Sequence, residues 1–317
     1  VRVETHDVIL RHLRIRVGEI KGPGRLRRVL GEQTHALDLA GMNVIADHCE
    51  AAYANDQIFN TYGTVLREAA TLQWSMVYGG PTKSTHEKGS HSMSTVAVGW
   101  TFVSLHHNLF AHTRLRNPRV DMLTYDFRNN VVYNFYGNGY GSDNDTRRLN
   151  YVGNTLKKGP DTTGSTAYAF SGTGPYWQYF AADNRVPADF EGVIEAKEVT
   201  PRSRPIPFAP VTTHAADEAF RLVVAQSGAT KPVRDAISTW VAQSVIDGTG
   251  SVPGTPDDWP HGGFPTYAPA KAPADTNANG IPDAWELARG LDSATCKATG
   301  RDFDPRYDNI EVYLNSL

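Results

Sequence analysis

Three short motifs carry side chains whose chemistry suits an acidic ligand. They read NVIADHCEAAYAND at 43–56, HEKGSH at 86–91 and HHNLFAHTRLRNPRV at 106–120. Together they place carboxylates, a lysine and several arginines on short runs that alternate polar and apolar residues, which is the period of a β-strand. If these strands stack, the charged side chains meet in one cleft that is cationic and also bears carboxylates. Such a cleft fits an acidic polymer.

The elements that must position these motifs form a loose repeat from Val8 to about Val186. Each unit is a short alternating strand with a polar end, followed by a turn. The units align when they are anchored on Cys49, Met76, Asn108, Asn130, Asn154 and Asn184. The anchors are roughly 22 to 32 residues apart, a spacing typical of solenoid repeats. Asparagines at matching corners predict a ladder of side-chain hydrogen bonds. By itself the pattern also fits a β-sandwich.

The motif order resembles that of the pectate lyase type of polysaccharide lyases, in which D-H-C, H-x-K and R-x-P follow one another. The resemblance covers nearly the whole chain. It implies an all-β fold, a right-handed parallel β-helix. The residues themselves further predict peripheral helices and a small C-terminal calcium-loop segment. It also implies cleavage of an acidic, uronate-containing glycan by β-elimination, with pectate or polygalacturonate as the expected substrate.

The same resemblance assigns roles to individual residues. Arg116 in R-N-P-R matches the arginine that removes the C5 proton, and Lys88 in H-E-K matches the lysine that holds the uronate carboxylate. Arginine normally stays protonated in proteins, so residue chemistry alone supports only a carboxylate clamp at Arg116. We expect Arg119 to take part in catalysis, and we expect Arg114, His91 and His107 to bind substrate.

For the histidines and the aspartate near these motifs, a structural role is favoured over a functional one. His106 and His107 are adjacent on a strand, so one of them must point inward. Asp47 and His48 fit a hydrogen-bonded pair at a strand end. The aromatic residues that fit either stacking on sugar rings or packing on the solenoid are Tyr136, Tyr140, Tyr176 and Trp177.

The chain departs from the family at the active-site calcium. The resemblance places its three acidic ligands at His35, Ala52 and Asp56, so only Asp56 is retained as a metal ligand. The second arginine of the family, five residues after Arg116, is Asp121 here. Glu50 and Asp47 are carboxylates nearby but outside the matched positions.

Three explanations stay open at this stage. The chain binds calcium only together with an acidic substrate, or it cleaves methylated pectin or another uronan without active-site calcium, or it is a non-catalytic carbohydrate-binding β-helix. Lys88 and Arg116 together favour an enzyme, because a binding protein has no need of that pair.

A second candidate calcium site lies near the C-terminus. The segment DTNANGIPDAWE at 275–286 fits the EF-hand loop pattern D-x-[DN]-x-[DN]-G-x5-E. The predicted ligands are Asp275, Asn277, Asn279, the carbonyl of Ile281, Asp283 and Glu286. One Ca²⁺ ion with a structural role is expected there.

The bulk composition bounds the remaining questions. The chain has 317 residues, of which 40% are hydrophobic and 21% charged, and its net charge of −3 argues against a nucleic-acid partner. No apolar run is long enough for a membrane span, and two cysteines make no disulfide framework. No secretory leader is recognisable in this sequence. We expect a monomer, and the resemblance alone implies secretion and an acidic polysaccharide partner.

The domain organisation is expected to have three parts. Residues 1–200 form the β-helix with the catalytic cleft, 201–254 a proline-rich connector with packing helices, and 255–317 an appendage with the EF-hand-like loop. The first helix is expected to begin at a Thr213 N-cap, and the second to run from about Pro232 to Ile246 and to end before Gly248.

Overall fold

The computed structural model describes residues 1–18, 34–61, 67–84, 86, 88–91, 93–98, 100–121, 123–142, 147–162, 167–269 and 271–317. These residues form two compact units, Val1–Pro265 and Thr266–Leu317. The expected division at residues 200 and 254 stays a prediction.

Strands of the first unit form three parallel sheets, which we name A, B and C. Sheet A contains β1 (Arg2–Val3), β4 (Leu37–Leu39), β7 (Gln57–Asn60), β10 (Met93–Val98), β13 (Arg119–Asp121), β16 (Gly139–Ser142), β19 (Tyr168–Thr173) and β21 (Gly192–Lys197). Sheet B contains β2 (His6–Arg11), β5 (Met42–Asp47), β8 (Arg67–Gln73), β11 (Trp100–His106), β14 (Thr124–Arg128), β17 (Arg147–Val152), β20 (Trp177–Ala182) and β22 (Thr200–Pro201). Sheet C contains β3 (Arg14–Arg16), β6 (Glu50–Ala52), β9 (Met76–Tyr78), β12 (Leu109–Thr113), β15 (Val131–Phe135) and β18 (Thr155–Lys157).

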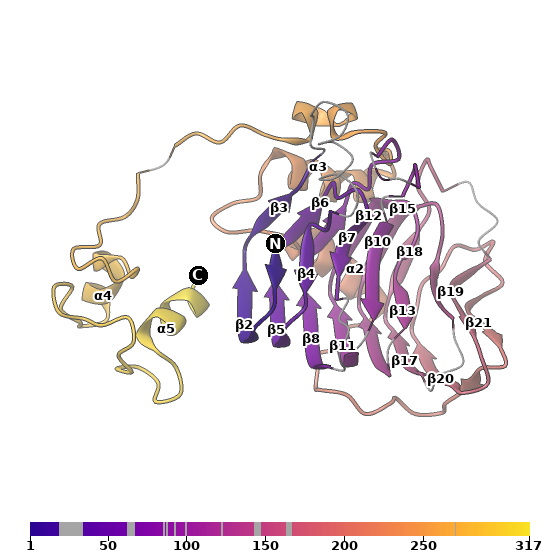
Figure 1. Cartoon of the computed structure of the whole chain (residues 1–317), viewed down its shortest axis with the longest axis horizontal. Coiled ribbons are helices and arrows are strands. Elements are labelled where there is room, and N and C mark those ends of the chain that lie inside the picture. The colour runs from indigo at the N-terminus through magenta and orange to yellow at the C-terminus, as the bar shows by residue number, and fades with distance from the viewer. Residues whose placement is uncertain are drawn as a thin grey trace. The chain divides into compact units, whose positions relative to one another are not determined.

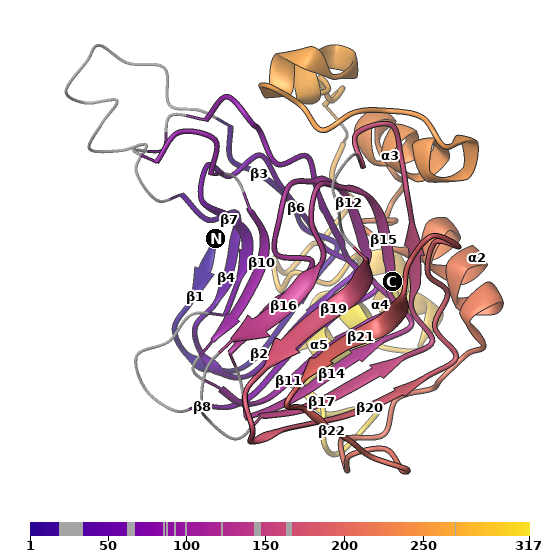
Figure 2. The same ribbon diagram turned by 90° about the vertical axis from the view of Figure 1, so that its right-hand side faces the viewer.

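The chain visits the sheets in the order A, B, C and then returns to A, so each circuit is one rung of a solenoid. Successive rungs pair in parallel; Phe102 on β11, for example, pairs with Thr124 on β14. Figures 1 and 2 show the rungs stacked from β2 to β20. This arrangement is a parallel β-helix, which confirms the expected fold class and excludes the β-sandwich.

A ladder of polar side chains fixes the corner between sheets B and C. Asn108, Asn130 and Asn154 each accept a backbone N–H from the preceding rung and receive the side-chain amide of that rung's asparagine where one is present. Asn184 ends the ladder, and the rungs are joined across 22, 24 and 30 residues. The predicted ladder is therefore confirmed. On the rung of β9 its member is Ser75, one residue before the anchor chosen from the sequence.

The residue just before each ladder position differs in type from rung to rung but has the same backbone conformation. His48, Trp74, His107 and Asn129 all have a positive φ, between 48° and 56°. In this left-handed conformation the chain turns sharply, and the following side chain points inward to the ladder.

The interior of the solenoid is apolar and partly aromatic. Phe127 stacks on Tyr151 with ring centroids 5.2 Å apart and contacts Phe110 at 5.7 Å. All three rings are fully buried. Burial of one such ring stabilises the fold by about 1.5–3 kcal/mol, so the stack gives the rungs a rigid base for the side chains on their outside.

Two helices, α2 (Ala216–Gln226) and α3 (Ala236–Asp247), pack on the outer face of sheet C, as Figure 2 shows beside β12 and β15. The side chain of Asp235 caps α3 by accepting the N–H groups of Ile237 and Ser238, and Gly248 ends it with a φ of 74°. The predicted Thr213 cap is wrong. The N-cap residue of α2 is Ala215, and the first helical N–H, from Ala216, is satisfied by Asp183 instead.

Two short 3-10 turns, η1 (Pro256–Asp258) and η2 (Pro260–Gly263), complete the first unit. The second unit contains α4 (Asp283–Ala288) and α5 (Asn309–Asn315). Within it Trp285 packs edge to face against Tyr313, 5.4 Å away, and donates a hydrogen bond to Ser316. Among the described residues, each helix is too short or too polar to cross a membrane.

Candidate active site

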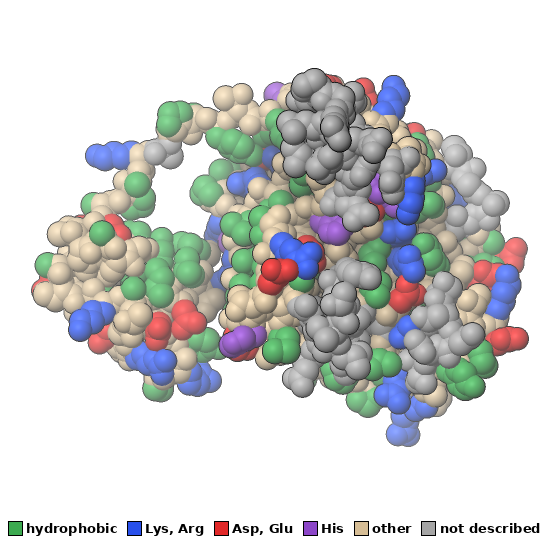
Figure 3. Space-filling model, in the orientation of Figure 1, with side chains coloured by type: hydrophobic (Ala, Val, Ile, Leu, Met, Phe, Trp, Pro, Cys, Tyr) green, Lys and Arg blue, Asp and Glu red, His purple; other side chains and the backbone are tan. Residues whose placement is uncertain are grey.

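The motif residues meet at the corner where sheet C returns to sheet A. Asp56 precedes β7, His86, Lys88 and His91 lie in the connection from β9 to β10, and Arg116 lies in the turn from β12 to β13. Backbone hydrogen bonds hold these three turns in contact: Met93 N–H donates to the carbonyl of Asp56, and Thr95 N–H to that of Arg116. Figure 3 shows histidine and basic side chains gathered on the face that carries β7, β10 and β13.

The side chain of Arg116 is held by a chain of hydrogen bonds. Its Nη1 donates to Oε1 of Gln57 at 2.6 Å, and Nε2 of Gln57 donates to Oδ1 of Asp56 at 2.5 Å. Arg116 has a φ of 65°, the left-handed conformation that also turns the chain at the corners between sheets B and C. Asn117 keeps the turn in shape, because it accepts from Thr113 and donates to the carbonyl of Gly137.

Lys88 has the exposed side chain that a group reaching for a polymer requires. Its backbone N–H donates to Nδ1 of His86 at 3.1 Å, which fixes the start of the side chain. In the described part of the chain its ammonium group makes no ion pair within 4.0 Å. An exposed lysine without a carboxylate partner is able to bind an incoming anion without breaking an existing pair.

The other predicted arginines are placed differently. Arg119 pairs with Asp121 at 2.7 Å and lies 6.0 Å from the ring centre of Tyr140. Arg114 donates to the carbonyl of Ser90, so it holds the β9–β10 connection. Both arginines lie at the same corner as Arg116, but each already has a partner within the protein. Their expected roles with substrate stay predictions.

Asp56 lies at the centre of a cluster of imidazoles. It is 7% exposed, and its Oδ2 lies 3.4 Å from Nε2 of His35, while Oδ1 lies 3.2 Å from Nε2 of His91. The ring of His86 stacks on that of His91 with centroids 4.2 Å apart. Burial by itself would raise the pKa of Asp56, but the hydrogen bond and charge of His35, aided by His91, lower it below its ordinary value.

His35 is the unusual member of this cluster. Its ring lies between two carboxylates, with Nδ1 at 3.7 Å from Asp38 and Nε2 at 3.4 Å from Asp56. Burial by itself would lower the pKa of His35, but hydrogen bonds and charges from Asp38 and Asp56 outweigh it and raise the pKa to about 9. The raised pKa favours the protonated, cationic form of the ring at neutral pH.

These residues do not fit a calcium ion. Calcium prefers six to eight oxygen ligands, whereas Asp56 is surrounded by imidazole nitrogens and Ala52 offers no side-chain ligand. His35 already supplies a positive charge between Asp38 and Asp56. Glu50 cannot compensate, because it is fully buried and accepts hydrogen bonds from Arg16 and Tyr78.

The structure places some candidates away from this corner. His107 lies at the corner between sheets B and C, where it stacks on Trp74 at 4.3 Å and its Nε2 meets His214 at 3.0 Å. It is not brought together with Arg116 and Lys88, and its expected role in substrate binding stays a prediction. Asp47 and His48 form the expected strand-end pair, 2.7 Å apart.

The aromatic candidates also divide. Trp177 is 1% exposed and packs inside the solenoid against Phe170, so it cannot stack on a sugar ring. Tyr176 beside it is 58% exposed. No role was predicted for Gln57 or for His86 of the HEKGSH motif. Gln57 is adjacent to Asp56 in sequence, but no sequence feature indicated that its amide joins Asp56 to Arg116.

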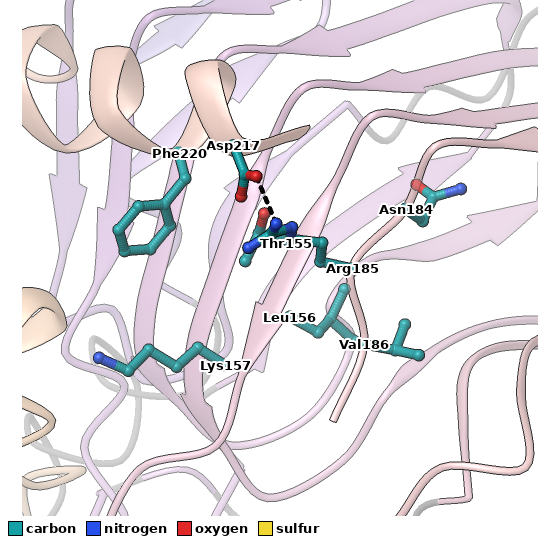
Figure 4. Close-up of a pocket in the computed structure, with 8 residues that line it drawn as sticks. All are labelled: Thr155, Leu156, Lys157, Asn184, Arg185, Val186, Asp217 and Phe220. Atoms are coloured by element: carbon teal, nitrogen blue, oxygen red, sulfur yellow. Dashed lines mark hydrogen bonds and ion pairs between the residues drawn. The ribbon is translucent and has the colours of Figure 1, made fainter. Parts of the chain in front are cut away.

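A separate open cavity of about 700 Å³ lies beside α2, as Figure 4 shows. Arg185 there pairs with Asp217, and Lys157 donates to the carbonyls of Val245 and Ile246. Both cations are engaged within the protein, so this cavity is a poor site for an acidic polymer. The lining residues are Thr155, Leu156, Lys157, Asn184, Arg185, Val186, Asp217 and Phe220.

The fold places the protein among the parallel β-helix proteins, and its cationic corner suits an acidic ligand. Comparison with known sequences indicates which β-helix proteins it resembles. No family model matches the chain. The chain is 29% identical over 328 residues to a protein named probable pectate lyase C from Aspergillus flavus, a match that covers 98% of this chain and 72% of that protein. It is also 29% identical over 325 residues to a protein of the same name from Emericella nidulans, covering 98% and 71% of the two chains. Similarity over nearly the whole length, together with the fold, supports a pectate lyase-like family.

Proposed function

We propose that the protein is a polysaccharide lyase, a carbon–oxygen lyase that cleaves an acidic, uronate-containing glycan by β-elimination, with pectate as its substrate. The observation that carries this proposal is the corner where sheet C returns to sheet A. There Arg116 is held by Gln57 beside the connection that carries the exposed Lys88. The full-length similarity to proteins named pectate lyase supports the same reaction.

The reaction needs three contributions from the protein. A base must take the C5 proton, the C5–H electrons then form the C4–C5 double bond, and the C4–O bond breaks with its electron pair on the departing oxygen. The carboxylate next to C5 must be neutralised, because its charge opposes loss of the proton. The departing oxygen finally acquires a proton from water.

The residues at the corner match these tasks. Lys88 neutralises the uronate carboxylate, since its ammonium group is exposed and makes no ion pair among the described residues. Arg116 removes the C5 proton. A guanidinium group loses its own proton only in strongly cationic surroundings, so Lys88 and His35 must act on it together. Gln57 holds Arg116 in place.

Active-site calcium is not needed in this account. His35 supplies the positive charge that neutralises Asp56, and the cluster around Asp56 lacks the oxygens that calcium prefers. The three explanations left open by the sequence pair pectate with calcium and a calcium-free site with methylated pectin or another uronan. We propose a different combination, a lyase without active-site calcium that acts on pectate or a related uronan.

The loop at 275–286 fits a structural Ca²⁺ ion, and we propose that it binds one. Gly280 has a φ of 86°, as the sharp turn of the loop requires, and Glu286 is fully buried with no hydrogen-bond partner for its Oε2 among the described residues. A buried carboxylate oxygen without a partner is costly unless a cation or proton meets it. The residues that would hold the ion are Asp275, Asn277, Asn279, Ile281, Asp283 and Glu286.

Two further proposals follow the family. The acidic polysaccharide partner is the substrate itself, and secretion suits an enzyme whose polymer substrate lies outside the cell. A monomeric state stays a prediction.

The test is an ultraviolet assay of the unsaturated product. The protein is incubated with polygalacturonate, methylated pectin and other uronans, each with calcium and with a chelator. We expect absorbance from new double bonds on polygalacturonate in both conditions, and its loss in Lys88→Ala. The matched control is Lys83→Ala, an exposed lysine in the same connection. Binding of every uronan without new double bonds would favour the carbohydrate-binding alternative, and activity that vanishes with chelator would contradict the absence of active-site calcium.

A further inference from the structure

A group of possible metal ligands lies in the cleft, where two turns meet. Asp56 comes from the turn before β7, and His86 and His91 come from the β9–β10 connection. Each offers one ligand atom, and these atoms all lie within 4.8 Å of one another. Asp56 is 7% and His86 5% exposed, so both are largely removed from water.

The spacing suits a small cation. Zinc binds nitrogen and oxygen ligands at roughly 2.0–2.2 Å, which puts neighbouring ligands in a tetrahedral site about 3.4 Å apart. Nε2 of His91 and Oδ1 of Asp56 are already 3.2 Å apart. With all the ligand atoms within 4.8 Å of one another, closure around an ion needs shifts of about 1.5 Å or less.

The chemistry of the ligands selects the ion. Imidazole suits zinc, cobalt, nickel and copper, whereas calcium and magnesium prefer oxygen. Two imidazoles and one carboxylate with a position left over for water or a ligand carboxylate match a common zinc arrangement. Binding has a cost, because Nδ1 of His86 accepts the N–H of Lys88 and Oδ1 of Asp56 accepts from Gln57. At least one of these bonds must rearrange.

We propose that Asp56, His86 and His91 bind a late first-row transition-metal dication, with zinc as the reference ion, at the place where the family resemblance would put calcium. The ion would lie next to Lys88 and would add its charge to those of Lys88, Arg116 and His35. Binding must therefore also overcome repulsion from His35, whose Nε2 lies 3.4 Å from Asp56. This proposal does not rest on the lyase reaction, because it is tested by binding alone.

The experiment uses the full chain, freed of metal with a chelator and returned to excess calcium so that the C-terminal loop is saturated. Cobalt(II) is titrated in and followed by its visible absorption, and zinc is then added to displace it. We expect one cobalt ion per chain with the strong absorption of a four- or five-coordinate site. In His86→Gln and His91→Ala the affinity should fall by at least about 100-fold, since even the loss of an outer-shell partner costs 10- to 100-fold.

The control separates this site from the other histidines. His107→Ala removes the central ring of the group at the opposite corner and should leave cobalt binding unchanged. Loss of binding in His107→Ala with retention in His86→Gln would overturn the proposal. Because a variant can fail to fold, X-ray absorption of the zinc-loaded natural protein supplies a second readout. Two imidazoles in the zinc shell are expected, and a shell without imidazole would also overturn the proposal.

Discussion

The asparagine ladder makes a prediction whose size follows from the structure. Asn130 takes part in four side-chain hydrogen bonds: its Oδ1 accepts the backbone and side-chain N–H groups of Asn108, and its Nδ2 donates to Leu105 and Asn154. Asn130 is 1% exposed, so water cannot easily replace these partners. At about 1 kcal/mol for each net hydrogen bond, Asn130→Ala should lower the free energy of unfolding by about 4 kcal/mol.

The comparison variant is Asn184→Ala at the end of the ladder. Asn184 also makes four side-chain hydrogen bonds, to Asn154, Tyr151 and Ala182, but it is only partly buried. Water can satisfy the groups that the substitution exposes, so the loss should be about 1–2 kcal/mol.

Urea unfolding of both variants, followed by circular dichroism, measures the difference. A solenoid can unfold in parts, so the transition must be the same with tryptophan fluorescence before free energies are compared. The reasoning is refuted if Asn130→Ala costs less than Asn184→Ala, or if neither changes the urea midpoint.

Three further predictions concern acid, calcium and the position of Arg116. Burial lowers the pKa of His112 to about 4, so between its ordinary pKa of about 6.5 and pH 4 the unfolded chain takes up a proton that the folded chain does not. Stability should thus fall by up to about 3 kcal/mol more in the natural protein than in His112→Gln between pH 7 and pH 4, measured by urea unfolding; equal slopes would argue against it. Calcium should protect the C-terminal unit from proteolysis in the natural protein but not in Glu286→Gln, while Asp302→Asn, outside the proposed loop, should keep the protection. Gln57→Ala should lower kcat/KM by roughly 10- to 100-fold, as expected for a lost hydrogen bond to a charged group, and an unchanged kcat/KM would mean that Arg116 needs no support.

Much of the scaffold could be predicted because it repeats. A polar residue at each corner and alternating residues in each strand recur along the chain, and each repeat checks the others. The one-residue error at Met76 arose because that rung uses Ser75 in place of asparagine: the Ser75 hydroxyl oxygen accepts the backbone N–H of Cys49. A hydroxyl accepts the same backbone hydrogen bond, so the geometry tolerates a change that hides the pattern in the sequence.

The site was predicted only where a motif named a residue. Lys88 and Arg116 lie at one corner because parallel rungs bring equal turns together. Gln57 was missed, and His35 was noted only as a replacement for a calcium ligand of the family. The roles of both depend on contacts between rungs of unequal length, which the sequence does not reveal. His107 shows that a motif does not fix the place of each of its residues: it belongs to the same motif as Arg116, but it lies on the other side of β12, at the corner between sheets B and C.

The most direct test of Arg116 as the general base of a lyase compares it with a second arginine. Each of the two donates a hydrogen bond to a glutamine side-chain oxygen. Arg116 donates to Gln57 in the cleft, and Arg202, which is exposed, donates to Gln178 at the far end of sheet B. Initial rates of double-bond formation on polygalacturonate should fall by roughly 10²- to 10⁴-fold in Arg116→Ala, the range for loss of a general base, and should not change in Arg202→Ala. Turnover that survives in a folded Arg116→Ala variant would contradict the account.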